Sequence, residues 1–159
     1  MNPLRTVAIV MGRQPWLPKF GKVIVGLDKG IQRLTNGHMT LLSSCGLTGL
    51  MLTVKGRKTG IERETPLLYT PHPDGPLIAG SNWGQEKPPA WVANLRAAQT
   101  AQVMANGVRT TVRARELEGT EREEKLAEMV KVWPNYRIYV EKAAPRVIPI
   151  FQLEPVLGA

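Results

Sequence analysis

Short extended segments separated by turn-forming residues constrain the fold of this chain more than any other feature of its sequence. Six segments after residue 47 are rich in apolar and β-branched residues, and most end at Gly, Pro, Asn or Asp: residues 50–55, 64–70, 76–80, 101–105, 108–117 and 147–154. Such segments are typical of β-strands. Asn106-Gly107 between two of them predicts a two-residue hairpin, since both central positions of that turn need positive φ.

Two helices are expected among the strands, over residues 88–98 and 120–133. Because they do not alternate regularly with the strands, the pattern favours a mainly β (α+β) fold: an antiparallel barrel of about six strands with flanking helices. We expect a single domain overall. Residues 1–46 form an N-terminal amphipathic helical segment in it, and residues 47–159 form the barrel with the binding site.

Charge and cysteine content narrow the classes of partner. The chain has 159 residues and a formal net charge of +8, which favours an anionic partner: nucleic acid, a lipid surface or an anionic small molecule. The single cysteine, Cys45, excludes an internal disulfide, and no Cys/His cluster has the spacing of a zinc site, so we expect no metal. With no signal-peptide pattern and no apolar run of ~20 residues, the sequence predicts a cytoplasmic protein.

The segment over residues 18–37 is expected to form an amphipathic helix. Its apolar residues recur at helical spacing and its other face is basic: Val23, Leu27, Ile31 and Leu34 against Lys19, Lys22, Lys29 and Arg33. We expect the apolar face to pack on the domain. The alternative is peripheral contact with the inner face of the cell membrane, because basic amphipathic helices bind anionic lipid surfaces.

A cluster of cations follows the first expected strand. Residues 54–60 are Val-Lys-Gly-Arg-Lys-Thr-Gly, and Arg63 comes shortly after. Glycines let backbone N–H groups approach an oxyanion, and Lys and Arg side chains form charge-assisted hydrogen bonds with phosphate or carboxylate. The loop therefore indicates an anion site. The alternative is a solvated basic hairpin tip.

A small, polar turn, Ala79-Gly-Ser-Asn-Trp-Gly84, links an expected strand to the helix over residues 88–98. Its backbone amides, with Ser81 and Asn82, are suited to hydrogen bonds with the carbonyls and ring N–H of a flat heterocycle. Trp83 or Trp91 is suited to packing on the face of such a ring. For Trp91 the alternative is a place in the core.

Two tyrosines three residues apart, Tyr136 and Tyr139, lie within residues 133–140 and would share one face of a helical turn. A phenol can donate a proton to an anion that forms on a substrate during reduction. The alternative is that the pair belongs to an amphipathic lid or to the edge of the core.

Four stretches in order resemble the deazaflavin-dependent nitroreductase family: LMLTVKGRKTGIERETPLLY, LIAGSNWGQEKPPAWVANLRA, VRTTVRARELEGTEREEKL and WPNYRIYVEKAAPRVIPIFQLEPV. That family contains split β-barrel proteins that use coenzyme F420, many of them nitroreductases or quinone reductases of actinobacteria. The resemblance covers residues 47–156 and is loose over residues 1–46. It implies a split β-barrel and F420 as the cofactor.

The resemblance also implies roles for individual residues. The cofactor's phosphate and oligoglutamate tail would be bound by Lys55, Gly56, Arg57, Lys58, Thr59, Gly60 and Arg63. The deazaflavin ring would be lined by Ala79, Gly80, Ser81, Asn82, Trp83, Trp91 and Asn94. The substrate side would be covered by Trp133, Tyr136 and Tyr139, with a tyrosine as proton donor. Asn82-Trp83 and Trp133 depart from relatives that carry Lys-Gly and tyrosine there, which brings nitro-prodrug activity into question more than the cofactor.

The expected function is transfer of hydride from reduced F420 to a flat, apolar acceptor such as a quinone or nitroaromatic. Alternatives are a split barrel that uses flavin mononucleotide and a non-catalytic cofactor carrier. Binding of single-stranded nucleic acid is disfavoured because the strands offer few exposed aromatic residues. We expect a monomer or a homodimer.

Overall fold

The computed structural model describes residues 2–158. It contains one six-stranded antiparallel sheet in the order β2-β1-β4-β5-β6-β3. The strands are β1 (Gly49–Lys55), β2 (Glu62–Leu68), β3 (Leu77–Ala79), β4 (Thr100–Ala105), β5 (Val108–Glu116) and β6 (Ile150–Pro155). The helices are α1 (Pro3–Gly12), α2 (Gly21–Leu34), α3 (Ala90–Ala98), α4 (Gly119–Val132) and α5 (Asn135–Ala143).

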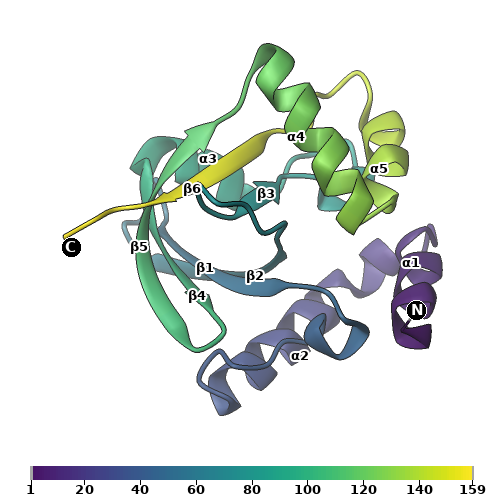
Figure 1. The fold of residues 1–159 in the computed structure, drawn as a ribbon, viewed down its shortest axis with the longest axis horizontal. Helices are drawn as coiled ribbons and strands as arrows, with labels where there is room; N and C mark the ends of the chain where they lie inside the picture. The colour runs from purple at the N-terminus through teal and green to yellow at the C-terminus, as the bar shows by residue number, and fades with distance from the viewer. Residues whose placement is uncertain (1, 159) are drawn as a thin grey trace.

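The sheet curls into a partly open barrel, as the sequence predicted. Its two edge strands approach each other through a bridge in which Thr70, just after β2, exchanges two backbone hydrogen bonds of 2.9 Å with Leu77 of β3. The β4–β5 hairpin turns at Asn106 and Gly107, whose φ values are 49° and 77°. The predicted hairpin is thus confirmed. On the open side of the curl, α4 and α5 lie above and α1 and α2 lie below (Figure 1).

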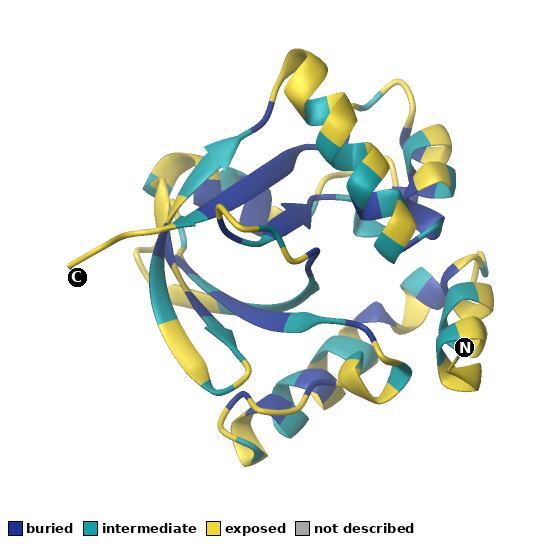
Figure 2. Cartoon of the chain, in the orientation of Figure 1, coloured by how far each residue is buried: buried dark blue, intermediate teal, exposed yellow. Residues whose placement is uncertain are grey.

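Two hydrophobic clusters hold these layers together. Alternate residues of β1, namely Leu50, Leu52 and Val54, point into the barrel and pack with Trp91 of α3 and Phe151 of β6. The second cluster lies under α4 and α5 and is built from Leu77, Met129, Trp133, Tyr136, Tyr139 and Ile150, among others. The dark interior of the curled sheet in Figure 2 corresponds to the first cluster.

The orientation of α2 in the N-terminal segment contradicts one prediction from the sequence. Helix α2 buries Gly21, Asp28 and Gln32, whereas Val23, Leu27 and Leu34 are 60%, 58% and 88% exposed. The apolar stripe of this helix therefore faces outward, and the prediction that it packs on the domain is wrong. Helix α1, which lies in the predicted helical segment 1–46 but was not predicted as a separate helix, likewise exposes Leu4, Val7, Val10 and Met11. Among residues 2–158, no helix has the length and apolar character needed to cross a membrane.

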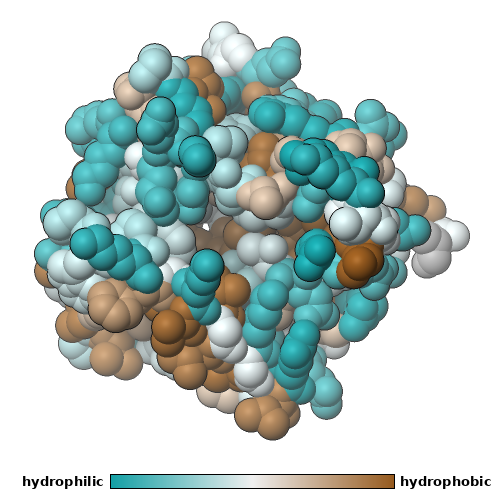
Figure 3. Space-filling model, turned by 180° about the vertical axis from the view of Figure 1, so that it is seen from behind, coloured by the Kyte–Doolittle hydropathy of each residue, from teal (hydrophilic) through white to brown (hydrophobic). Residues whose placement is uncertain are grey.

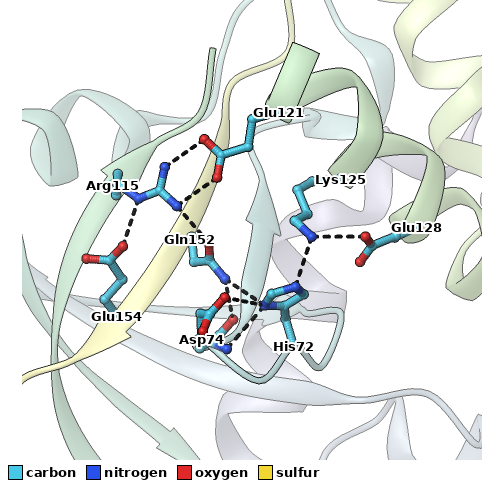
Figure 4. Close-up of polar contacts among 9 residues, drawn as sticks. His72, Asp74, Arg115, Glu121, Lys125, Glu128, Gln152 and Glu154 are labelled. Carbon is cyan, nitrogen blue, oxygen red and sulfur yellow. Dashed lines mark hydrogen bonds and ion pairs between the residues drawn. The ribbon is translucent and has the colours of Figure 1, made fainter. Parts of the chain in front are cut away.

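A polar network ties α4 to the sheet on the side away from α1 and α2 (Figure 4). Arg115 of β5 donates two hydrogen bonds of 2.9 Å to Glu121, one of 2.7 Å to Glu154 and one of 3.0 Å to Gln152. Lys125 of α4 lies 2.9 Å from both Glu128 and His72. These contacts pull the first turns of α4 onto β5 and β6.

Candidate functional site

A cavity of about 380 Å³ lies between the sheet and the helices on its open side. Each helical layer contributes to its wall: Ala8, Met11 and Gly12 of α1; Ile24, Val25 and Asp28 of α2; Trp91 of α3; Trp133 just after α4; and Tyr136 and Tyr139 of α5. The rest of the wall is formed by Thr65 to Leu68 of β2 and by Leu17, Leu41, Leu42, Ala79, Ser81, Asn82, Trp83 and Pro89. Its largely apolar and aromatic lining suits a flat, apolar molecule.

The two predicted tyrosines have different surroundings. Both are buried, and their rings meet edge to face with centroids 6.3 Å apart. The Tyr139 hydroxyl donates a 2.8 Å hydrogen bond to the Gly12 carbonyl of α1, so its proton is engaged in holding that helix. Within residues 2–158 the Tyr136 hydroxyl makes no such bond, and burial raises the pKa of this phenol well above its usual value. Tyr136 therefore keeps its proton at neutral pH, and that proton is not engaged in a hydrogen bond within residues 2–158.

Helix α1 is fastened over the cavity by further contacts with the α4–α5 junction. Asn135 donates to the Ile9 carbonyl at 2.8 Å and accepts from Arg13 at 3.0 Å. Arg5 donates to the Val132 carbonyl at 2.9 Å, one of the last carbonyls of α4. These bonds satisfy helix-end groups that would otherwise lack partners. They make α1 part of the wall of the site.

The turn after β3 has a strained backbone. Asn82 and Trp83 have φ values of 45° and 52°, a region that costs ~1 to 3 kcal/mol for residues other than glycine. Arg146, which follows α5, donates hydrogen bonds to the carbonyls of Gly80, Ser81 and Gln85 at 2.8 to 3.1 Å. The backbone amides of Ser81, Asn82 and Trp83 have no partner among the described residues. The predicted cluster of free amides is therefore present.

The tryptophans divide between packing and the cavity. Trp91 does both, since it lines the cavity and packs at 5.9 Å on Phe151 in the barrel core. Trp83 lies over the start of α2, where a Cβ on Gly21 would come within 3.0 Å of the indole. Trp133 is buried beside Gly12 of α1. The three rings thus join the barrel, α1 and α2 around one space.

The predicted basic loop connects β1 to β2, and its six residues from Lys55 to Gly60 lie together at the surface with Arg63. Asn94 of α3 accepts hydrogen bonds from the Arg57 amide at 3.1 Å and from its guanidinium at 3.3 Å. The Gly56 and Gly60 amides bond inside the loop, to the carbonyls of Ile61 and Gly56. The two glycine amides are therefore engaged, whereas the Lys58 and Thr59 amides have no partner within residues 2–158. The anion site on this loop stays a prediction.

The positive side chains and the amides of Lys58 and Thr59 remain as the loop's means of holding an anion. No ion pair within residues 2–158 involves Lys55, Arg57, Lys58 or Arg63. An open groove of about 600 Å³ runs beside the loop and is lined by Lys55, Gly56 and Arg57 together with Ala97 and Ala98 at the end of α3. Helix α3 thus links the two regions, because Trp91 lines the cavity and Asn94 fixes the loop.

Sequence reasoning missed two residues of the site. Asp28 is a buried carboxylate in the cavity wall that accepts from the Leu41 amide at 2.7 Å and from Gln32 at 3.3 Å. Arg146 reaches a turn more than sixty residues away in the chain. Neither residue belongs to a local pattern that points to a ligand. The only available signal for Asp28 was its place opposite the apolar stripe of α2.

Comparisons with known proteins agree with this geometry. A family model described as F420H(2)-dependent quinone reductase matches residues 27–155. An F420H(2)-dependent quinone reductase of Mycobacterium tuberculosis is 31% identical over 101 residues, which are 63% of this chain and 68% of that protein. The resemblance to deazaflavin-dependent enzymes is therefore confirmed.

Two solved structures share the fold. One, described as an F420-H2 dependent reductase (FDR-A), is 33% identical and covers 67% of this chain and 93% of its own, with a TM-score of 0.62. The other, described as a domain-swapped dimer, is 28% identical and covers 80% of this chain and 96% of its own, with a TM-score of 0.64. With the family model spanning most of its length, the chain belongs to the F420H(2)-dependent quinone reductase family.

Proposed function

We propose that this protein reduces a flat, apolar acceptor, with a quinone favoured over a nitroaromatic, by hydride supplied from reduced F420. The observation that carries the proposal is the aromatic cavity whose wall includes a turn with three unpaired backbone amides. When bound, the reduced deazaflavin supplies the hydride. The protein's residues supply orientation, exclusion of water and a proton.

The residues present fit a deazaflavin. The amides of Ser81, Asn82 and Trp83 need acceptors, and the carbonyl oxygens of a flat heterocycle would provide them. Trp91 and the apolar wall would pack against the ring. Flavin mononucleotide has a similar ring, but family membership indicates F420.

The basic loop would hold the anionic tail. Lys55, Arg57, Lys58 and Arg63 are exposed cations on one hairpin, and Asn94 fixes the backbone beneath them. Charge-assisted hydrogen bonds to phosphate or carboxylate are about twice as strong as neutral ones. The loop would therefore contribute affinity, and the cavity would contribute the chemistry.

Tyr136 would protonate the acceptor. Hydride transfer to a quinone leaves an anion on the acceptor oxygen, and one proton completes the hydroquinone. Of the two tyrosines in the wall, Tyr136 is the one whose proton is not engaged within residues 2–158. Water would later return the proton to the phenol.

A fluorescence titration tests the cofactor, and turnover tests the reaction. F420 added to the protein should quench tryptophan emission, since Trp83 and Trp91 line the cavity, while flavin mononucleotide should quench it less. Reduced F420 should then be oxidised in the presence of menadione. Binding without turnover would support the carrier alternative, and quenching by flavin mononucleotide alone would overturn the proposal.

We further propose that α1 and α2 contact a membrane surface peripherally. Their outer faces expose Leu4, Val7, Val10, Met11, Val23, Leu27 and Leu34, and Phe20 is exposed in the connection between them. Figure 3 shows brown side chains along the lower edge, where these helices lie in that view. The exposed Trp16 and Phe20 rings, 5.8 Å apart, are of the kind that settles at a lipid interface. Lys19 and Lys22 are exposed cations near the stripe and suit anionic headgroups, whereas Arg33 is paired with Glu64 at 2.8 Å.

Co-sedimentation with vesicles tests this contact. The protein should pellet with anionic vesicles, and a double change, Val23→Glu and Leu27→Glu, should abolish pelleting. Val108→Glu is the matched control, because Val108 is 63% exposed at the β4–β5 hairpin. Equal loss in both variants, or binding that survives the double change, would refute the assignment. Whether the chain is a monomer or a homodimer stays a prediction, to be settled by light scattering.

A further inference from the structure

Arg146 gathers the carbonyl oxygens of the turn after β3. Its Nη1 donates to Gly80 at 3.1 Å, its Nη2 donates to Ser81 at 3.0 Å and to Gln85 at 2.8 Å, and its Nε donates to Gln85 at 3.2 Å. Arg146 makes no ion pair with any carboxylate in residues 2–158. A cation that is half-buried without an acidic partner is therefore compensated by backbone dipoles alone.

Because the peptide group is planar, these contacts also fix the direction of the neighbouring N–H groups. In a trans peptide the C=O and the next N–H point in opposite directions. Because the Gly80 and Ser81 carbonyls point at the guanidinium, the Ser81 and Asn82 N–H groups point away from it. Ser81 and Asn82 line the cavity, whereas Arg146 does not. The guanidinium thus lies behind the turn, with the N–H groups on its other side.

The backbone angles of this turn arrange its N–H groups into a concave set of hydrogen-bond donors. Ser81 has a right-handed helical conformation (φ −75°, ψ −36°), and Asn82 and Trp83 follow with φ of 45° and 52°. Successive right-handed and left-handed residues form a nest, in which neighbouring N–H groups converge on one anionic atom. The Gly84 and Gln85 amides are bonded within the turn, to the Ser81 and Asn82 carbonyls. The free amides are therefore those of Ser81, Asn82 and Trp83.

We propose that Arg146 is a positioning residue that holds and polarises this nest, so that the nest stabilises negative charge on a ring oxygen of the reduced cofactor. The proposal rests on the function proposed above and extends it to a residue outside the cavity. A cation bonded to the carbonyl end of a peptide withdraws electron density and strengthens the N–H at its other end. Charge beside the ring is one of the ways in which a protein tunes a redox cofactor.

Comparing the affinities for reduced and oxidised F420 separates an electrostatic role of Arg146 from a purely structural role. Loss of the cation should weaken binding of reduced F420 more than binding of oxidised F420, because in this proposal it is the hydride added on reduction that places negative charge on the ring oxygen facing the nest. Affinities of the anaerobic protein for both forms would be measured by tryptophan quenching in the wild type, Arg146→Met, Arg146→Lys and Arg137→Met. Arg137 is an exposed arginine of α5 whose side chain makes no hydrogen bond or ion pair within residues 2–158, and it serves as the control.

We expect Arg146→Met to weaken binding of reduced F420 about tenfold more than binding of oxidised F420. A tenfold change in that ratio corresponds to a lowering of the bound two-electron potential by about 30 mV. Arg146→Lys should recover part of the difference, and Arg137→Met should leave both affinities unchanged. Equal weakening of the two forms in Arg146→Met would overturn the proposal. Wild-type protein that binds neither form would instead overturn the proposed function.

A second pair of variants keeps the test decisive if Arg146→Met fails to fold. The φ of Ser81 is close to that of proline, so Ser81→Pro deletes one donor of the nest without demanding a new φ. Ser81→Ala removes the hydroxyl but keeps the N–H and is its reference. The proline variant should lose several-fold more affinity for reduced than for oxidised F420 relative to the alanine variant. Identical affinities in the two variants would contradict the nest.

Discussion

At the scale of single residues, two tyrosines three positions apart hold their protons differently. The Tyr139 hydroxyl donates a hydrogen bond to the Gly12 carbonyl, while the Tyr136 hydroxyl has no acceptor among the described residues. Tyr136→Phe should lower menadione turnover with little change in F420 affinity. Tyr139→Phe should instead lower the free energy of unfolding by ~0.5 to 1.5 kcal/mol, the net value of one hydrogen bond. Steady-state kinetics and chemical denaturation separate the two effects, and unchanged turnover in Tyr136→Phe would assign the proton to solvent.

The cations of the β1–β2 loop carry the second prediction. Lys58→Ala should weaken F420 binding, and Lys58→Ala with Arg57→Ala should weaken it further, by ~1 to 3 kcal/mol in total, because charge-assisted hydrogen bonds are lost. Part of the Arg57 effect comes from its bond to Asn94. Isothermal titration with F420 measures the loss. Lys131→Ala on α4 removes an exposed positive charge elsewhere and should not change the affinity.

Local sequence patterns found the residues of contiguous motifs and missed the residues that act across the fold. The basic loop and the turn with its free amides were predictable because glycine, cations and small polar residues occur there side by side. Arg146 was not, because its partners Gly80 and Gln85 lie 66 and 61 residues away. The glycine amides of the loop are engaged for a local reason: glycine permits a close approach to an anion but also permits the tight internal bond from the Gly60 amide to the Gly56 carbonyl.

At the scale of elements, α2 shows that periodicity identifies a helix without identifying its packed face. Its outward stripe is more apolar than its inward one, which contains Gly21, Asp28 and Gln32. The polar inward residues are satisfied locally, since Asp28 accepts from Leu41 and Gln32. The bounds of α1 within the predicted helical segment 1–46 were missed although a start signal was available: Asn2 caps the helix by accepting from the Leu4 amide, and proline follows at the first helical position.

The close contact of α1 with the start of α5 predicts how one substitution would displace the whole helix α1. A Cβ on Gly12 would come within 2.5 Å of Asn135 and 2.7 Å of Trp133. Gly12→Ala should therefore displace α1 and cost ~1 to 3 kcal/mol of stability, the range for overpacking. Gly26→Ala is the control, because nothing lies within 4 Å of its Cβ position; it should stabilise α2 by ~0.8 to 1 kcal/mol. Denaturation measures both, and faster protease cleavage before residue 20 in Gly12→Ala would locate the displacement.

At the scale of the whole molecule, the network between α4 and the sheet makes stability depend on acid. Hydrogen bonds from Arg115 hold the pKa of Glu121 and of Glu154 below the usual value of 4.5, and Lys125 does the same for Glu128. Groups with a depressed folded pKa contribute stability above the unfolded value and lose it as pH falls through the folded value. Below pH 4.5 the melting temperature should therefore fall.

Arginine variants on β5 test this dependence. Arg115→Leu removes the partner of Glu121 and Glu154, so its melting temperature should change less between pH 7 and pH 3 than that of the wild type. Arg109→Leu is the control, since Arg109 bonds the uncharged Gln102, and it should keep the wild-type slope. Parallel melting curves for Arg115→Leu and the wild type would show that other carboxylates cause the acid sensitivity.

The wall of the cavity comes from two parts of the chain, one before and one within the range that the family model matches. The family model begins at residue 27, yet Ala8, Met11, Gly12, Ile24 and Val25 face the same space as the turn and the tyrosines. Shortening this chain to begin at residue 27 would remove these wall residues. The remaining cavity would then be wider and more accessible to water than the cavity of the full chain.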